Sequence, residues 1–266
     1  RDFTFDTLNR LFSSLKNSGY NFITVAEYFQ NPDMNCLILR HDVDARPENS
    51  LRCAELESRM GIRGTYYFRT VRKSYDEGII KEISRLGHEI GYHYEDFAVA
   101  RGDYSLAIRL FEQNLAKLCR LVPIETICMH GSPLSKYDNR KLWEKYDYRD
   151  FGIRGEPYLD IDFREVLYLT DTGRRWDGGR HSIRDRVTPG AFYPAAAAEP
   201  ASKRQAFRST FDIVNAAAAG ILPLKVLLTL HPQRWDDNHL PWLKELLLQN
   251  MKNIGKALIN RAPIRR

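Results

Sequence analysis

The sequence predicts an α/β fold in a single domain, built from parallel strands that are each followed by a helix. Short apolar runs rich in β-forming residues alternate with helical patterns along the chain. Its length of 266 residues suits a barrel of β/α units, which routinely forms one domain. Several predicted strands also end in Asp or His, as strands in enzymes of this class do.

The elements follow from periodicity and from glycine positions. Residues 4–17 form an amphipathic helix, because Leu8, Leu11, Phe12 and Leu15 recur with helical spacing. We expect strands at 36–39, 65–68, 89–92, 126–129, 166–170 and 224–230. We expect further helices at 48–60, 77–86, 104–120 and 240–259. Residues 173–200 are rich in Gly and Pro and predict a long loop of the kind that is often functional.

Composition is typical of a globular protein, with 43% hydrophobic and 28% charged residues. A core of this size needs no structural metal, so a bound metal would serve chemistry. The net charge of +6 favours an anionic partner such as an acidic or phosphate-bearing sugar. Because the basic residues look dispersed, nucleic acid is not an expected partner.

Several features predict a cytoplasmic protein. The four cysteines form no C-x-x-C pair, which is typical of free thiols in a reducing compartment. No run of apolar residues reaches the roughly 20 needed for a transmembrane helix. The first residues do not have the pattern of a secretory signal.

A pair of carboxylates follows the first buried strand. Asp42 and Asp44 alternate with Val43, so in extended chain they project to the same side. Two such carboxylates repel each other unless a cation lies between them, and a divalent metal resolves this conflict. One could ligate the metal while the other accepts a proton. The competing interpretation is a turn or helix cap before residue 48.

Three histidines end other predicted strands. His93 closes the run Gly-His-Glu-Ile-Gly-Tyr-His, in which the small Gly91 would leave space near a metal. His130 begins His-Gly-Ser-Pro, and His231 follows the last predicted strand. Polar residues at equivalent strand ends are hard to explain by packing alone, and together they predict an active site.

With these motifs, residues 35–235 resemble the polysaccharide deacetylase family, also called NodB-homology or carbohydrate esterase family 4. The first motif is similar to the His-Asp-Val-Asp branch associated with O-antigen and surface polysaccharide biosynthesis. The resemblance implies a distorted (β/α) barrel of about seven strands. Residues 1–34 would be a helical lead-in and residues 238–262 a closing helix. It also implies a hydrolase that removes an N-acetyl or other acyl group from a sugar or glycan.

The resemblance assigns roles to single residues. It makes Asp42 the general base, His231 the general acid, and Asp44 and His93 ligands of one divalent metal ion, expected to be zinc. Ser132 and three residues near 170–176 are expected to orient or bind substrate. Those three are Asp171, Arg175 and Trp176, the last of which could stack on a sugar or simply anchor its loop.

Two departures from the family pattern bear on the metal. Phe97 stands where the family has its second metal-binding histidine, and it cannot ligate. His130 stands in the run that replaces the family's Arg-Pro-Pro. We therefore expect His130 to be the third ligand, with Glu95 as the alternative.

Two other functions fit the same pattern. One keeps the fold and changes the bond, as in a deformylase or another sugar amidase. The other is a non-catalytic barrel that binds glycan or an anionic partner, and Phe97 is the feature that favours it. Metal content separates the second possibility from an enzyme.

Overall fold

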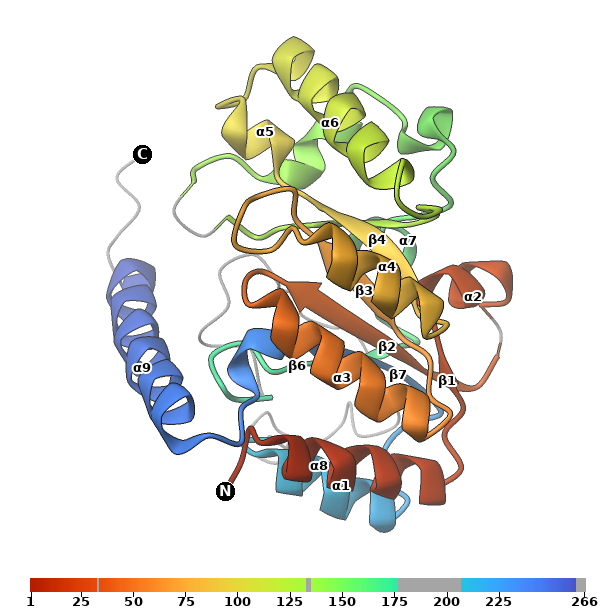
Figure 1. Cartoon of the computed structure of the whole chain (residues 1–266), viewed down its shortest axis with the longest axis vertical. Coiled ribbons are helices and arrows are strands. Elements are labelled where there is room, and N and C mark those ends of the chain that lie inside the picture. Colours follow the sequence, from red (N-terminus) through yellow and green to blue (C-terminus); the bar gives the residue numbers. More distant parts are fainter. Residues whose placement is uncertain (33, 133–134, 177–206, 262–266) are drawn as a thin grey trace. The chain divides into compact units, whose positions relative to one another are not determined.

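The computed structural model describes residues 1–32, 34–132, 135–176 and 207–261, with side chains as far as residue 253. The chain forms two compact units (Figure 1). The first comprises Arg1–Asn21, Asn35–Leu37 and Asp162–Arg266, and the second comprises Phe22–Met34 and Ile38–Ile161. Each unit is described separately below, and the single domain stays a prediction.

The second unit is built on parallel strands that neighbour one another in chain order. They are β2 (Cys36–Val43), which belongs to this unit from Ile38 on, β3 (Thr65–Phe68), β4 (Glu89–Tyr94) and β5 (Ile127–Met129). The short strand β1 (Phe22–Ile23) pairs with β2. Because all four strands run the same way, their carboxyl ends lie along one edge of the sheet.

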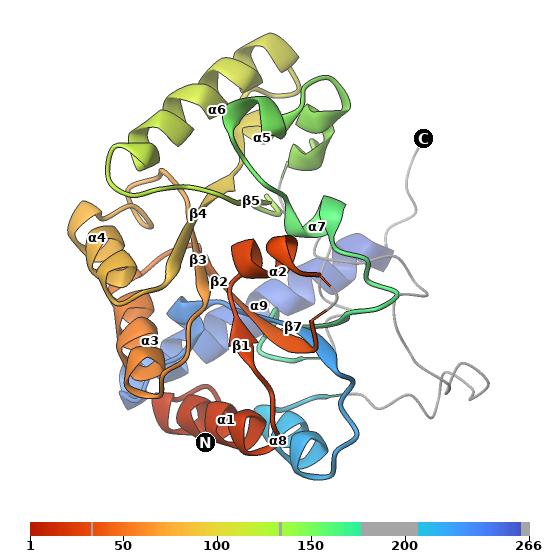
Figure 2. The same ribbon diagram turned by 90° about the vertical axis from the view of Figure 1, so that its right-hand side faces the viewer.

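Helices alternate with these strands, as the sequence pattern predicts. Figures 1 and 2 show α3 and α4 along one face of the strands β2 to β4. The longer helices are α3 (Pro47–Arg59), α4 (Glu77–Arg85) and α6 (Tyr104–Cys119). The shorter ones are α2 (Val25–Gln30), α5 (Asp96–Val99), α7 (Pro157–Asp160), η1 (Asn139–Glu144) and η2 (Tyr148–Phe151).

Local chemistry sets the helix ends. Proline occupies the first turn of α3, where its missing N–H costs nothing. The side chains of Asp76 and Asp103 accept backbone hydrogen bonds at the starts of α4 and α6. Gly61 follows α3 with a φ of +65°, a conformation that glycine adopts without strain.

The first unit contains the parallel strands β6 (Leu167–Thr170) and β7 (Lys225–Leu230). In both views α1 (Phe5–Asn17) lies beside α8 (Thr210–Ala218), and Ser14 and Ser18 donate hydrogen bonds to backbone oxygens of that helix. The remaining elements are η5 (Pro232–Arg234) and α9 (His239–Arg261).

The predicted α/β class with a parallel sheet is confirmed. Strand β2 runs on to Val43 and β4 to Tyr94, so Asp42 and His93 lie inside strands and not after them. Most of the predicted loop at 173–200 falls outside the described residues. No disulfide joins the four cysteines. Within the described parts of the chain, no helix is long and apolar enough to cross a membrane.

Candidate metal centre

The carboxyl edge of the second unit's sheet gathers four of the predicted site residues. Asp42 lies near the end of β2 and Asp44 directly follows that strand, while His93 lies near the end of β4. His130 follows β5, and its backbone N–H donates a 2.8 Å hydrogen bond to the Tyr94 carbonyl, which extends the pairing of β4 with β5. Parallel register therefore brings residues about 90 positions apart in sequence to one place.

Asp44 lies near the Nε2 atoms of two histidines. Asp44 Oδ1 lies 3.6 Å from His93 Nε2 and 3.5 Å from His130 Nε2. Two zinc bonds of about 2.0–2.1 Å at a tetrahedral angle would separate their ligand atoms by about 3.3 Å. The two imidazole rings are nearly perpendicular, with centroids 5.3 Å apart. Both distances from Asp44 Oδ1 are therefore close to the separation of two ligand atoms on one zinc ion.

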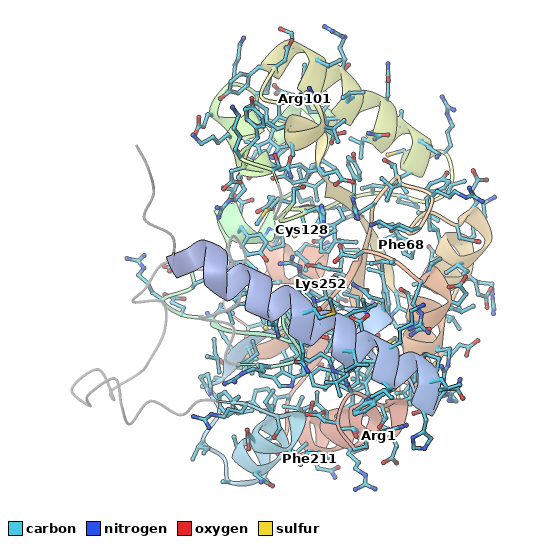
Figure 3. The ribbon with its side chains drawn as sticks, turned by 90° about the vertical axis from the view of Figure 1, so that its left-hand side faces the viewer. Arg1, Phe68, Arg101, Cys128, Phe211 and Lys252 are labelled. Atoms are coloured by element: carbon cyan, nitrogen blue, oxygen red, sulfur yellow. The ribbon has the colours of Figure 1, made fainter. Side chains whose placement is uncertain are left out.

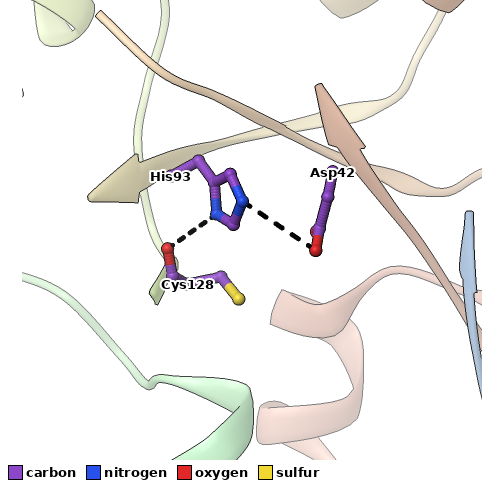
Figure 4. A group of neighbouring side chains, drawn as sticks. All are labelled: Asp42, His93 and Cys128. Carbon is purple, nitrogen blue, oxygen red and sulfur yellow. Dashed lines mark hydrogen bonds and ion pairs between the residues drawn. The ribbon is translucent and has the colours of Figure 1, made fainter. Parts of the chain in front are cut away.

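Each imidazole is oriented through its other nitrogen. His93 Nδ1 lies 2.9 Å from the carbonyl oxygen of Cys128 (Figure 4). His130 Nδ1 lies 3.0 Å from Glu95 Oε2. In both rings Nδ1 is then the donor, so a neutral imidazole keeps its lone pair on Nε2, the atom that faces Asp44. Such outer partners accompany metal-binding histidines almost always.

Glu95 supports His130 from behind. Arg69 donates to both carboxylate oxygens of Glu95 at 2.6 and 2.7 Å. Burial alone would raise the pKa of Glu95, but the hydrogen bond from His130 and the Arg69 guanidinium lower it to about 2. Because its oxygens already form hydrogen bonds with Arg69 and His130, Glu95 acts as an orienting group. The geometry therefore favours His130 over Glu95 as a metal ligand.

Burial keeps His93 in the form that binds metals. Its pKa falls to about 4, chiefly because burial disfavours the charged ring, while Asp42 partly offsets that effect. A neutral imidazole is the species that ligates zinc.

Arg40 holds Asp42 beside the three converging atoms. The guanidinium Nε and Nη2 donate to the two carboxylate oxygens at 2.8 and 2.6 Å, and both side chains are buried. Asp42 Oδ2 lies 3.9 Å from His93 Nε2 (Figure 4). Such a bidentate pair fixes the plane of the carboxylate. Arg40 was not predicted to belong to the site. Its position two residues before Asp42 on the same strand places both side chains on one face and is the signal that points to it.

A second set of possible ligands overlaps the first. Ligand atoms of Asp42, His93 and Cys128 all lie within 4.8 Å of one another (Figure 4). In this set Asp42 would ligate the ion while both of its oxygens also accept hydrogen bonds from Arg40, which would place the guanidinium charge next to the cation. We therefore assign the candidate centre to Asp44, His93 and His130.

Residues around the centre differ partly from expectation. The ring of Tyr67 fills the space above Gly91, since a Cβ there would lie 2.3 Å from the Tyr67 ring. The expectation that Gly91 leaves space for the metal is therefore wrong, and the glycine accommodates Tyr67. Ser132 was expected to bind substrate, and its Oγ lies 3.1 Å from Nδ1 of His130, so Ser132 contacts a candidate metal ligand. Phe97 packs against the ring of Tyr104 at 4.8 Å.

His41 of the first motif lies away from this centre. Its ring is fully buried and stacks on Tyr66 with centroids 4.0 Å apart. His41 Nε2 lies 2.8 Å from Glu57 Oε1 in helix α3. The adjacent position on a strand faces the opposite side of the sheet, so His41 packs under the helices while Asp42 faces the centre.

The first unit holds a second polar cluster, centred on Asp171. Asp171 Oδ1 lies 2.6 Å from His231 Nδ1 and accepts a 2.6 Å hydrogen bond from Arg234. The other oxygen accepts from the His231 backbone and from the Trp235 indole at 3.0 and 2.9 Å. Burial opposes ionisation, but Arg234 and His231 lower the pKa of Asp171. The carboxylate is thus anionic and fixes the His231 ring.

Trp176 has the surroundings of a loop anchor. Its side chain is buried, and the indole N–H donates a 3.0 Å hydrogen bond to Thr210 Oγ1. Its ring centroid lies 6.3 Å from that of Trp235. Arg175 beside it is half-buried. Of the two interpretations of Trp176, the structure favours the anchor over a surface for stacking on sugar.

The chain shows little similarity to known proteins. No model of a protein family matches the chain, and no curated protein matches it. One similar solved structure is the Xyl-CE4 domain of a multidomain xylanase from the hindgut metagenome of Trinervitermes trinervoides. The two chains are 13% identical over 84% of this chain and 85% of that one, with a TM-score of 0.37. A match at that level assigns neither family nor activity.

Proposed function

We propose that this chain is a metal-dependent hydrolase that removes an N-acetyl or other acyl group from a sugar. The observation that carries the proposal is the convergence of Asp44, His93 and His130 beside the Arg40-bound carboxylate of Asp42. The resemblance of the strand-end motifs to polysaccharide deacetylases supports the choice of an acylated sugar.

Asp44, His93 and His130 would hold one divalent ion, for which zinc suits the two nitrogens and one oxygen. Three protein ligands are the usual number in catalytic zinc sites. When bound, such an ion polarises an acyl carbonyl and lowers the pKa of a water molecule.

Asp42 is the proposed general base. Its carboxylate lies next to the ligand cluster without belonging to it, and Arg40 keeps it oriented. A base needs an ionised oxygen within reach of the attacking water. Because Arg40 forms hydrogen bonds with both oxygens, the proton must go to the second lone pair of one of them.

His231 is the proposed general acid. Asp171 fixes the ring through Nδ1 and would stabilise the charged imidazolium, which leaves Nε2 as the atom that gives a proton to the departing amine. This assignment comes from the family-like Leu-His motif and from the Asp171 contact within the first unit.

Two other functions could use the same residues. A deformylase or another amidase would use the same groups on a different acyl substrate. The non-catalytic alternative depends on Phe97, and the 3.5 Å distance from His130 Nε2 to Asp44 Oδ1 is an argument against it, because His130 could take the place of the missing histidine. We keep an acidic or phosphate-bearing sugar, O-antigen biosynthesis and the cytoplasm as proposals for substrate, pathway and location.

The direct test is acyl hydrolysis by wild type and Asp42→Asn. We expect metal-dependent release of acetate from N-acetylated sugars and from an aryl acetate by wild type. Asn keeps the shape of Asp but cannot take a proton, so Asp42→Asn should lose about 10²–10⁴-fold in turnover while binding zinc normally. The surface variant Asp6→Asn serves as the control. An Asp42→Asn enzyme within a few-fold of wild type would show that Asp42 is not the base.

A further inference from the structure

Helix α9 carries an apolar stripe on its solvent side. Leu240, Leu243, Leu247 and Met251 recur at intervals of three and four residues, which places them on one helical face. Leu248 lies beside them. These five side chains are between 42% and 82% exposed. A surface helix of a globular protein normally turns its apolar face toward the core, so this stripe calls for an explanation.

The opposite face of α9 contacts the first unit. The Trp242 indole N–H donates to the backbone oxygen of Asp2 at 2.8 Å. Asn253 Nδ2 donates to the Gly173 oxygen at 3.0 Å, and Gln249 between them is buried. The helix therefore packs through Trp242, Gln249 and Asn253, while the leucines and Met251 of the stripe are exposed.

Most of the net positive charge of the chain comes from the same part of the sequence. From residue 239 to the end there are six Lys or Arg and one Glu, a net charge of +5 against +6 for the whole chain. The basic residues are Lys244, Lys252, Lys256, Arg261, Arg265 and Arg266. The preceding 238 residues thus carry a net charge of only +1. The Lys and Arg residues themselves are spread along the chain, but in the preceding residues acidic side chains nearly balance them.

We propose that α9 binds an anionic lipid surface. A helix that combines an exposed row of Leu and Met with flanking Lys binds in the plane of a membrane, with its apolar side chains among the acyl chains. Lys244 and Lys252 are both exposed, and Figure 3 shows Lys252 on this helix. Their long side chains can reach anionic headgroups while the stripe is buried.

Charge also favours a lipid surface over a second copy of the chain as the binding partner of α9. Pairing two α9 helices through their stripes would bring two segments of net charge +5 together, and like charges at close range repel. An anionic bilayer offers both the apolar interior and the opposite charge.

The experiment is sedimentation of the full chain with vesicles. One set is phosphatidylcholine alone, and the other contains about 30% phosphatidylglycerol. We expect binding to the anionic vesicles that weakens as salt rises, because headgroup attraction is screened. Binding to neutral vesicles should be at least tenfold weaker.

Three variants separate the contributions. Lys244→Gln with Lys252→Gln should weaken binding about 25-fold, at about fivefold for each charge near the surface. Leu240→Ser with Leu247→Ser and Met251→Ser should weaken it more than 100-fold through lost apolar burial. The matched control is Leu224→Ser, which removes a leucine of the first unit that is 67% exposed and lies outside α9. It should bind like wild type.

Several results would overturn the proposal. These are absence of binding to anionic vesicles, equal binding to both vesicle types, or an equal loss in Leu224→Ser. A dimer in sedimentation equilibrium that the triple Ser variant abolishes, without vesicle binding, would assign the stripe to a second copy instead. Hydrolysis of acylated sugars is not measured in this experiment, so the result is independent of the proposed function.

Discussion

At the scale of single residues, the candidate centre depends on groups that stand behind the ligands. His93 is oriented by a backbone carbonyl and His130 by the carboxylate of Glu95. Glu95 is in turn held by Arg69. A ligand whose ring is already fixed loses little rotational freedom when a metal binds, and its basicity rises next to a carboxylate.

This arrangement predicts that Glu95→Gln weakens zinc binding without removing a ligand. The amide lacks the negative charge that favours the donor form of His130 Nδ1, so the zinc Kd should rise about 10–100-fold. Calorimetric titration measures it. The control is Glu82→Gln, which breaks only an exposed pair with Arg85. An unchanged Kd in Glu95→Gln would mean that Glu95 does not act through His130.

Sequence reasoning reached these residues unevenly. Asp42, Asp44 and His93 could be grouped because each ends a predicted strand, and ends of parallel strands share an edge. The side chains that orient these residues were predicted less well. Glu95 was expected only as an alternative ligand and Arg69 was not named, although they directly follow the neighbouring parallel strands β4 and β3 and form an ion pair.

At the scale of elements, long helices and strands were predictable and short ones were not. The strand at 65–68 agrees with β3 residue for residue, because a buried run bounded by glycine and charge is distinctive. Helices α2 and α5 have six and four residues. That is too short for helical periodicity to show. Yet α5 sits directly after β4 and carries a buried carboxylate.

That carboxylate, Asp96, should make stability depend on pH. Asp96 accepts hydrogen bonds from Tyr92 and Asn114, but burial raises its pKa from 3.8 to about 6. The folded state therefore holds this proton more tightly than the unfolded state does. Its contribution is complete below pH 4 and is lost as pH rises to 6, by at most about 3 kcal/mol.

Asp96→Asn should remove that dependence, since an amide does not titrate. Denaturant unfolding of the metal-free protein at several pH values between 4 and 7 measures it. The difference in unfolding free energy between wild type and variant should shift in favour of the variant as pH rises. A difference that stays constant across this range would contradict a raised pKa for Asp96.

At the scale of the whole molecule, the predicted catalytic residues divide between the two compact units. Asp42, Asp44 and His93 belong to the second unit, whereas Asp171 and His231 belong to the first. The resemblance to deacetylases treats all of them as parts of one site. A functional measurement can establish whether one reaction uses both groups.

His231→Ala provides that measurement. Without the proposed acid, hydrolysis of an N-acetylated sugar should fall about 10²–10⁴-fold, because the departing amine must be protonated. An aryl acetate has a leaving group that needs no proton, so its hydrolysis should stay within a few-fold of wild type. Equal losses on both substrates would rule out a simple acid role for His231.

The central claim is that Asp44, His93 and His130 hold the metal, and X-ray absorption at the zinc edge tests it most directly. We expect one zinc ion per chain, with nitrogen or oxygen ligands at about 2.0–2.1 Å and no sulfur ligand. The spectrum should be unchanged in Cys128→Ser and should lose a histidine contribution in His130→Ala. A sulfur neighbour at about 2.3 Å would place the metal on Cys128 instead and contradict the assignment.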